Sequence, residues 1–216
     1  MKILNESLKD FLKFKESSDP IEDMGIGIRQ LIKSWMHNNK ILDEYDYHID
    51  SDTLLINTYN NTIVSNLNIK KFPEYIQFGK VIGGFHCEYN GMETLKGSPF
   101  VVLGSFLCSW NNLRTLEYSP KEVKGNFIAS HNDLISLKGI PKKLEQSISI
   151  SYNNLNSLKY IPNIIYGDFL IHQNPIETLK YFPSIIKGSL YYTRSDIINE
   201  DTIRERCNVE GNLIEK

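Results

Sequence analysis

The chain has 216 residues, three cysteines and a formal charge of −2. This length allows one domain with a buried core, and the nearly balanced charge argues against nucleic-acid binding, which depends on many basic contacts with phosphates. The sequence contains no run of about 18 apolar residues, so no membrane span is predicted, and no signal peptide is recognised. The odd number of cysteines favours a reducing, cytoplasmic location.

Residues 1–66 predict an N-terminal cap made of helices and a hairpin. Asn5 can cap a first short helix, and Asp19-Pro20 is a typical start of a second one. In this second helix an apolar stripe at helical spacing comprises Ile28, Leu31, Ile32, Trp35 and Met36. In residues 45–50 tyrosine and isoleucine alternate with charged or polar residues, which is typical of an edge strand with a charged outer face.

Downstream of the cap, the sequence repeats with a constant period of 21. An asparagine column comprises Asn90, Asn111, Asn132, Asn153 and Asn174. In each unit a leucine lies five residues after the asparagine and a proline lies nine residues after it. A glycine lies seven residues before the asparagine, except that Gln146 occupies this position once. A period in this range is typical of a solenoid, in which every repeat is one coil.

Each column has a physical role in such a coil. Phe106 and Cys108 alternate inward, so each coil is expected to contribute one short strand to a parallel sheet. An asparagine amide can both donate and accept hydrogen bonds, so a stack of asparagines can pair the buried backbone groups of successive turns. The proline cannot continue a helix and favours an extended return segment.

The repeat unit resembles the leucine-rich repeat, most closely its short bacterial and tailed-phage type. Phenylalanine or isoleucine replaces the usual first strand leucine. The resemblance implies an α/β solenoid, a leucine-rich-repeat stack with short parallel strands. We expect an N-terminal helical cap at 1–66, the solenoid at 67–195 and a C-terminal cap at 196–216. Residues 67–76 would be a degenerate first coil, and Asn199 would begin a short capping helix.

A second resemblance concerns the leader FKESSDPIEDMGIG at residues 14–27. It is similar to N-terminal segments of proteins from large tailed phages. This implies a viral origin and, in that case, a location in the host cytoplasm.

No motif for catalysis is present in the sequence. It lacks a phosphate-binding loop, a nucleophile elbow and an HExxH motif. Cys87 and Cys108 occupy the inward strand column, where a thiol without a cationic neighbour is inert. The three histidines of the repeats, which are His86, His131 and His172, occupy three different columns on three different coils, and a zinc site needs a tighter cluster. We therefore predict no cofactor, no metal site and no enzymatic activity.

An enzymatic alternative rests on the N-terminal cap. Asp46, His48 and Asp50 could belong to a hidden hydrolase or transferase site. These side chains are also what an exposed strand edge carries.

The outward strand positions predict a binding surface. One column of apolar residues lies beside a column of aromatic residues, and few charges interrupt them; this composition is typical of interface cores. The predicted protein-binding residues on this concave face are Tyr89, Leu107, Trp110, Ile128, His131, Tyr152, Leu170 and Tyr191. A structural alternative is that the aromatic column only shields the asparagine turns.

These patterns together favour a non-catalytic protein-binding module. The partner would be another protein of the host or the virus, bound on the concave face. The alternative is a virion or assembly component that self-associates.

Overall fold

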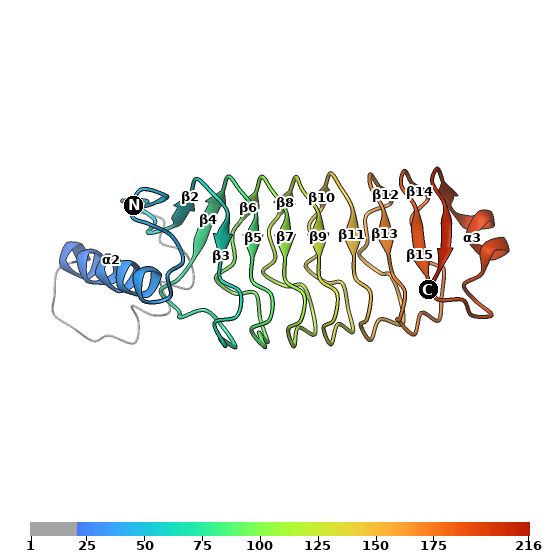
Figure 1. Cartoon of the computed structure of the whole chain (residues 1–216), viewed down its shortest axis with the longest axis horizontal. Helices are drawn as coiled ribbons and strands as arrows, with labels where there is room; N and C mark the ends of the chain where they lie inside the picture. Colours follow the sequence, from blue (N-terminus) through green and yellow to red (C-terminus); the bar gives the residue numbers. More distant parts are fainter. Residues whose placement is uncertain (1–20) are drawn as a thin grey trace.

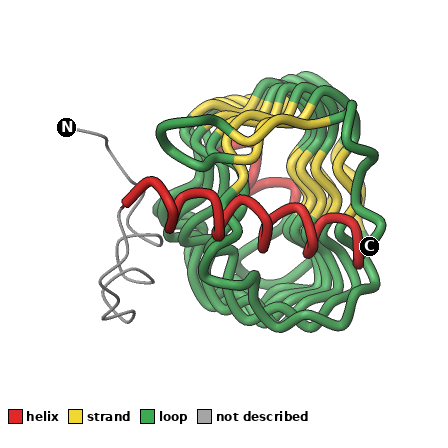
Figure 2. The backbone as a smooth tube through the Cα atoms, turned by 90° about the vertical axis from the view of Figure 1, so that its left-hand side faces the viewer, coloured by secondary structure: helices red, strands yellow, loops and turns green. Residues whose placement is uncertain are grey.

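The computed structural model describes residues 21–216, which form a parallel β-solenoid with two short helices (Figure 1). The helix expected after Asn5, the Asp19-Pro20 signal and part of the phage-like leader lie outside the described residues. The predicted stacking of 21-residue units is confirmed. Viewed along the axis, successive coils nearly superpose (Figure 2), so the rod is almost straight and its sheets are flat. The predicted concave face is therefore called the sheet face below.

Most coils contribute two short strands rather than the single strand that the sequence predicted. The first sheet contains β3 (Thr62–Ile63), β5 (Phe85–His86), β7 (Phe106–Leu107), β9 (Phe127–Ile128), β11 (Ile148–Ser149), β13 (Phe169–Leu170), β15 (Leu190–Tyr192) and β17 (Leu213–Glu215). The second sheet contains β1 (Tyr47–Ile49), β2 (Ile56–Thr58), β4 (Phe78–Val81), β6 (Val101–Val102), β8 (Glu122–Val123) and β10 (Lys143–Leu144). A third sheet contains β12 (Ile164–Ile165), β14 (Ile185–Ile186) and β16 (Asn208–Val209).

The additional strand follows the proline of each unit. A buried Val, Leu or Ile lies three residues after the proline, as Val102 and Val123 do, and these residue types suit strands. Both strands of a coil send side chains into one core. In that core Phe106 stacks on Phe85 at 5.8 Å and on Phe127 at 5.6 Å between ring centroids.

The N-terminal helix α2 (Ile21–Asn38) packs against the first coil. Ile28, Ile32 and Met36 are buried, and Trp35 meets Phe72 edge-on at 6.0 Å. Leu31, which the sequence placed on the same stripe, is 41% exposed. The strand predicted at residues 45–50 is present as β1, which pairs antiparallel with β2.

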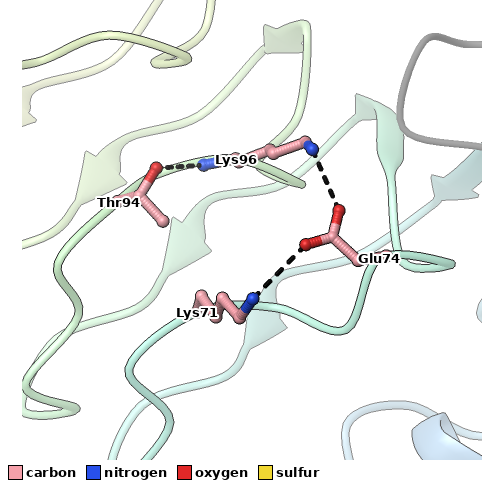
Figure 3. A network of polar contacts seen from close by, with 4 residues as sticks. All are labelled: Lys71, Glu74, Thr94 and Lys96. Carbon is pink, nitrogen blue, oxygen red and sulfur yellow. Dashed lines mark hydrogen bonds and ion pairs between the residues drawn. The ribbon is translucent and has the colours of Figure 1, made fainter. Parts of the chain in front are cut away.

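The first coil begins before the predicted boundary at residue 67. β2 and β3 are already in parallel register with β4 and β5, and residues 67–76 form the return segment between β3 and β4. Glu74 joins this return segment to the next one through an ion pair with Lys96 at 2.9 Å (Figure 3). It also contacts Lys71 of its own segment at 3.4 Å. The hydrogen bond from Lys96 lowers the pKa of Glu74.

The solenoid also continues beyond residue 195. Helix α3 (Glu200–Arg206) begins at the predicted N-cap Asn199, which forms a capping box with Thr202. After the helix, β16 and β17 pair in parallel with β14 and β15 and complete another coil. This coil was not predicted, because the segment that contains α3 is longer than one period of 21 residues. Leu190 therefore pairs with Leu213 rather than with the residue one period ahead.

Gln146 coincides with a break in the stacking. In the glycine column, the N–H groups of Gly104, Gly125, Gly188 and Gly211 donate to the C=O of the glycine in the preceding coil, as Gly125 does to Gly104 at 2.9 Å. A Cβ added at Gly125 or Gly167 would lie 2.6 Å from backbone of the preceding coil. A side chain in this column therefore requires the coils to separate. Within residues 21–216, the Gln146 N–H does not donate to Gly125, and the Gly167 N–H does not donate to Gln146.

The second sheet ends next to this corner. β10 closes that sheet and β12 opens the third, so no ladder connects them in the described part of the chain. A cleft of about 550 Å³ lies between them, lined by Lys142, Lys143, Leu144, Glu145, Pro162, Ile164 and Tyr166. Gln146 interrupts the column at the step from Gly125, where β8 and β10 still pair, and the sheet opens at the next step, between β10 and β12, while β11 and β13 remain paired on the other side.

Replacing Gln146 by glycine should close this break. The N–H of Lys187 bonds to Ile165 at 2.9 Å, whereas the equivalent N–H of Tyr166 has no protein acceptor within residues 21–216. In the native chain, the Tyr166 amide should therefore exchange its hydrogen faster than the Lys187 amide. In Gln146→Gly the two rates should converge, as measured by NMR-detected hydrogen exchange. An unchanged Tyr166 rate would show that Gln146 does not cause the break.

Candidate protein-binding face

An asparagine ladder supports the turn at the edge of the sheet face. Asn132 donates from Nδ2 to the C=O of Ala129 in its own coil at 3.3 Å and of Cys108 in the preceding coil at 3.1 Å. Its Oδ1 accepts the Leu113 N–H at 3.1 Å. The same donor pattern recurs at Asn90, Asn111, Asn153 and Asn174. One amide thus pairs backbone groups of two coils that water does not reach.

The residue before each ladder asparagine has a left-handed backbone. The φ angles of this column are positive, between 53° and 58°, at Tyr89, Trp110, His131, Tyr152 and Gln173. For a residue with a large side chain this conformation costs about 1–2 kcal/mol, and glycine or asparagine would avoid much of that cost. Bulky side chains nevertheless occupy the column in four successive coils. Something other than backbone preference therefore accounts for these residue types.

The four rings of this column form a continuous aromatic ladder. Trp110 stacks on Tyr89 at 5.7 Å and on His131 at 3.8 Å, and His131 stacks on Tyr152 at 4.2 Å between centroids. Their ring planes differ by at most 12°. Because the flat faces contact one another, the ring edges are what the ladder presents to solvent. Tyr89, Trp110 and Tyr152 remain 45–55% exposed.

An apolar column runs parallel to the aromatic ladder. Leu107, Ile128 and Leu170 are half-buried on the outward side of β7, β9 and β13. Tyr191 continues the column on β15. Ser149, which the sequence placed in the same column, is buried and lies 2.6 Å from Ser130 between hydroxyl oxygens.

Small polar residues separate the two columns. Ser109 and Ser151 are buried between them, and Ser151 Oγ lies 3.1 Å from His172 Nδ1. Burial and the nearby charge of Lys216 lower the pKa of His172, so its imidazole is neutral at neutral pH. All eight predicted binding residues thus belong to one face, where a half-buried apolar column and the aromatic ladder flank a column of mostly small polar residues.

Two residues at the ends of the apolar column were not predicted from the sequence. Ile63 lies beside His86 and is 54% exposed, and Ile214 lies beside Tyr191. Both steps are longer than the repeat, so a search at a fixed period of 21 does not find them. Gly211 lies two residues before Leu213, as Gly83 does before Phe85, but one glycine is not sufficient to identify the last coil.

Two further polar columns were also missed, although both keep the constant period of the repeat. At the corner, the side chains of Ser105, Asn126, Ser147, Asp168 and Ser189 each accept an N–H from the following coil. On the return segment, Thr94, Thr115, Ser136, Ser157 and Thr178 each accept the N–H two residues ahead. Short polar side chains at a constant spacing were the available signal.

The residues considered for chemistry do not converge. Cys87 and Cys108 are fully buried, and burial raises the pKa of both thiols. Within residues 21–216, no group of three or more His, Cys, Asp or Glu side chains is arranged to hold a metal ion. Asp50 instead accepts hydrogen bonds from Thr53, which lower its pKa.

The remaining members of the enzymatic alternative have structural partners. His48 lies 2.8 Å from the hydroxyl of Tyr59, and Asp46 accepts a hydrogen bond from Asn60. Across the same described range, no helix combines the length and apolarity needed to cross a bilayer.

Comparison with known proteins gives no relative. No family model matches the chain, and no curated protein or solved structure shows significant similarity to it.

Removing one rung of the asparagine ladder should destabilise the fold. Asn132→Ala deletes the acceptor of the buried Leu113 N–H, so the free energy of unfolding should fall by about 1–3 kcal/mol. Urea titration followed by circular dichroism measures this. Asn112→Ala is the matched control, since Asn112 is exposed in the neighbouring coil. Equal effects of the two substitutions would contradict the special role of the ladder.

Proposed function

We propose that the chain is a non-catalytic module that binds another protein through the sheet face. The observation that carries this proposal is the aromatic ladder. Four bulky residues occupy a backbone conformation that disfavours them, and three of them are about half exposed. Strained and exposed residues concentrate at functional sites. Burial in an interface would offset the cost of this conformation.

The shape and composition of the face support a protein partner. Tyrosine and tryptophan are enriched in the centres of protein interfaces, where charged residues are depleted. Since the rings stack on one another, a sugar or a nucleobase cannot lie flat on them between Tyr89 and Tyr152. Their edges, with hydroxyl, indole and imidazole groups, suit hydrogen bonds to a polypeptide.

The finer identity of the module is part of the same proposal. The asparagine turns and inward leucines support a leucine-rich-repeat relationship, while the second strand in each coil departs from the one-strand expectation. The leader resemblance supports a phage protein that acts on a host or viral partner in the host cytoplasm. Self-association as a virion or assembly component is the alternative, and it uses the same face.

A double substitution on the face should abolish partner binding and leave the fold intact. In Trp110→Asn with Ile128→Glu, asparagine relieves the left-handed strain while the stacking is lost, so the two stability effects nearly cancel. The melting temperature should therefore change by less than about 4 °C. Affinity capture from bacterial lysate, with the native chain and the double variant as baits, should lose the specific partner with the variant.

The matched control lies outside the face. Tyr118 also has a positive φ, of 68°, and Ile135 is half exposed. Tyr118→Asn with Ile135→Glu makes the corresponding changes, an aromatic residue to asparagine and isoleucine to glutamate, and should preserve capture. If the face variant melts far below this control, the aromatic ladder is structural; if both baits retain the partner, the sheet face is not the binding surface.

A further inference from the structure

We propose that the sheet face pairs with the same face of a second copy of this chain, with the two rods antiparallel. This inference rests on the proposed binding role of the sheet face and develops its self-association alternative. Three features of the face carry it: its flatness, the position of its charges and its area.

A flat face can pair with another flat face along its whole length. Neighbouring β-sheets usually twist relative to one another, which restricts contact between extended faces. Here successive coils nearly superpose along the axis (Figure 2). Side-chain columns of the first sheet therefore repeat at the strand spacing of about 4.8 Å. A second copy has the same repeat, so its columns stay in register with these.

The charges of the face lie at its two ends. Glu88, half-buried beside Ser65, is the acidic residue of the serine column and lies near the N-terminal end. Arg194 is exposed at the C-terminal end, where Lys216 also lies over the Tyr191 ring. Between these ends the three columns contain no Asp, Glu, Lys or Arg. In a parallel pair, like charges would meet at both ends.

An antiparallel pair brings opposite charges together. Five coils separate Glu88 from the coil of Arg194, since 88 plus five periods of 21 is 193. A two-fold axis along the strand direction, between the coils of Ser130 and Ser151, places each Glu88 opposite Thr193 of the second copy, next to Arg194 of the same coil. The neutral centre then meets itself, and the coil of Trp110 faces the coil of Gln173.

The charges therefore favour antiparallel over parallel rods. A shift by one coil still brings Glu88 near Lys216, which follows Thr193 in the same column.

The available area suits a reversible dimer. Eight strands spaced by about 4.8 Å, over about six residues of about 3.3 Å each, give a face of about 700 Å² per copy. Two copies would bury about 1,400 Å², within the range of specific interfaces.

Sedimentation velocity of the full chain over a concentration series tests the pairing. The native chain should show a concentration-dependent monomer–dimer equilibrium. Glu88→Lys alone and Arg194→Glu alone should each weaken the dimer by about tenfold or more, because like charges then meet at both ends. The double variant carries both exchanges and should restore the dimer, since each pair is re-formed with reversed signs. The control exchanges Lys124 and Glu145, which pair at 3.8 Å outside this face, and should have no effect.

Cross-linking tests the orientation. Under mild oxidation, a mixture of Tyr89→Cys and Arg194→Cys chains should form a disulfide-linked heterodimer, while neither variant alone should do so. The native cysteines are buried and serve as an internal background. A dimeric native chain in which this heterodimer does not form would overturn the proposed orientation, and a native chain that stays monomeric at every concentration would overturn the pairing.

These outcomes separate the inference from the proposed function. A monomeric chain that loses a foreign partner through Trp110→Asn with Ile128→Glu would overturn only the pairing of two copies. A chain in which that double variant changes neither dimerisation nor capture would overturn the binding role of the face itself.

Discussion

The structure depends on pairing buried backbone groups between coils at a fixed repeat. A solenoid coil has no helix or hairpin of its own to pair its turns, so every turn relies on the coil beside it. Asn132 shows how this works, because one side chain bonds to its own coil and to the one before it. Side chains from successive coils then form straight columns. Both the Phe core and the exposed aromatic ladder result from this register.

Much of the architecture could be predicted from the period alone. Because Phe106 and Cys108 alternate and Asn111 follows at a constant distance, the inward column, the turn and the stacking direction could be assigned from the sequence. The second strand could not be distinguished, since two residues such as Val101 and Val102 are too short for any periodicity. The flanking coils were missed where the step becomes longer than the period, as it does between Leu190 and Leu213.

The exposed face was predictable in composition and less so in conformation. Alternation identified Leu107 and Ile128 as outward residues, and the repeat placed Trp110 beside its asparagine. A positive φ at tryptophan could not be foreseen, because sequence preferences assign that backbone region to glycine and asparagine. The stacking of the rings follows from this backbone, which aims every side chain of the column in the same direction. Conformation and residue type therefore have to be considered together.

The break beside Gln146 has a consequence for how the rod comes apart. In a linear array, each coil gains stability only from its two neighbours, so the weakest junction divides the array into cooperative segments. Across this junction the coils share one continuous sheet, the Asn174 hydrogen bonds and the bridge between Ser157 and Thr178, but no ladder on the side of β10 and β12. Under tension along its axis, the molecule would yield there first and separate into two still-folded halves.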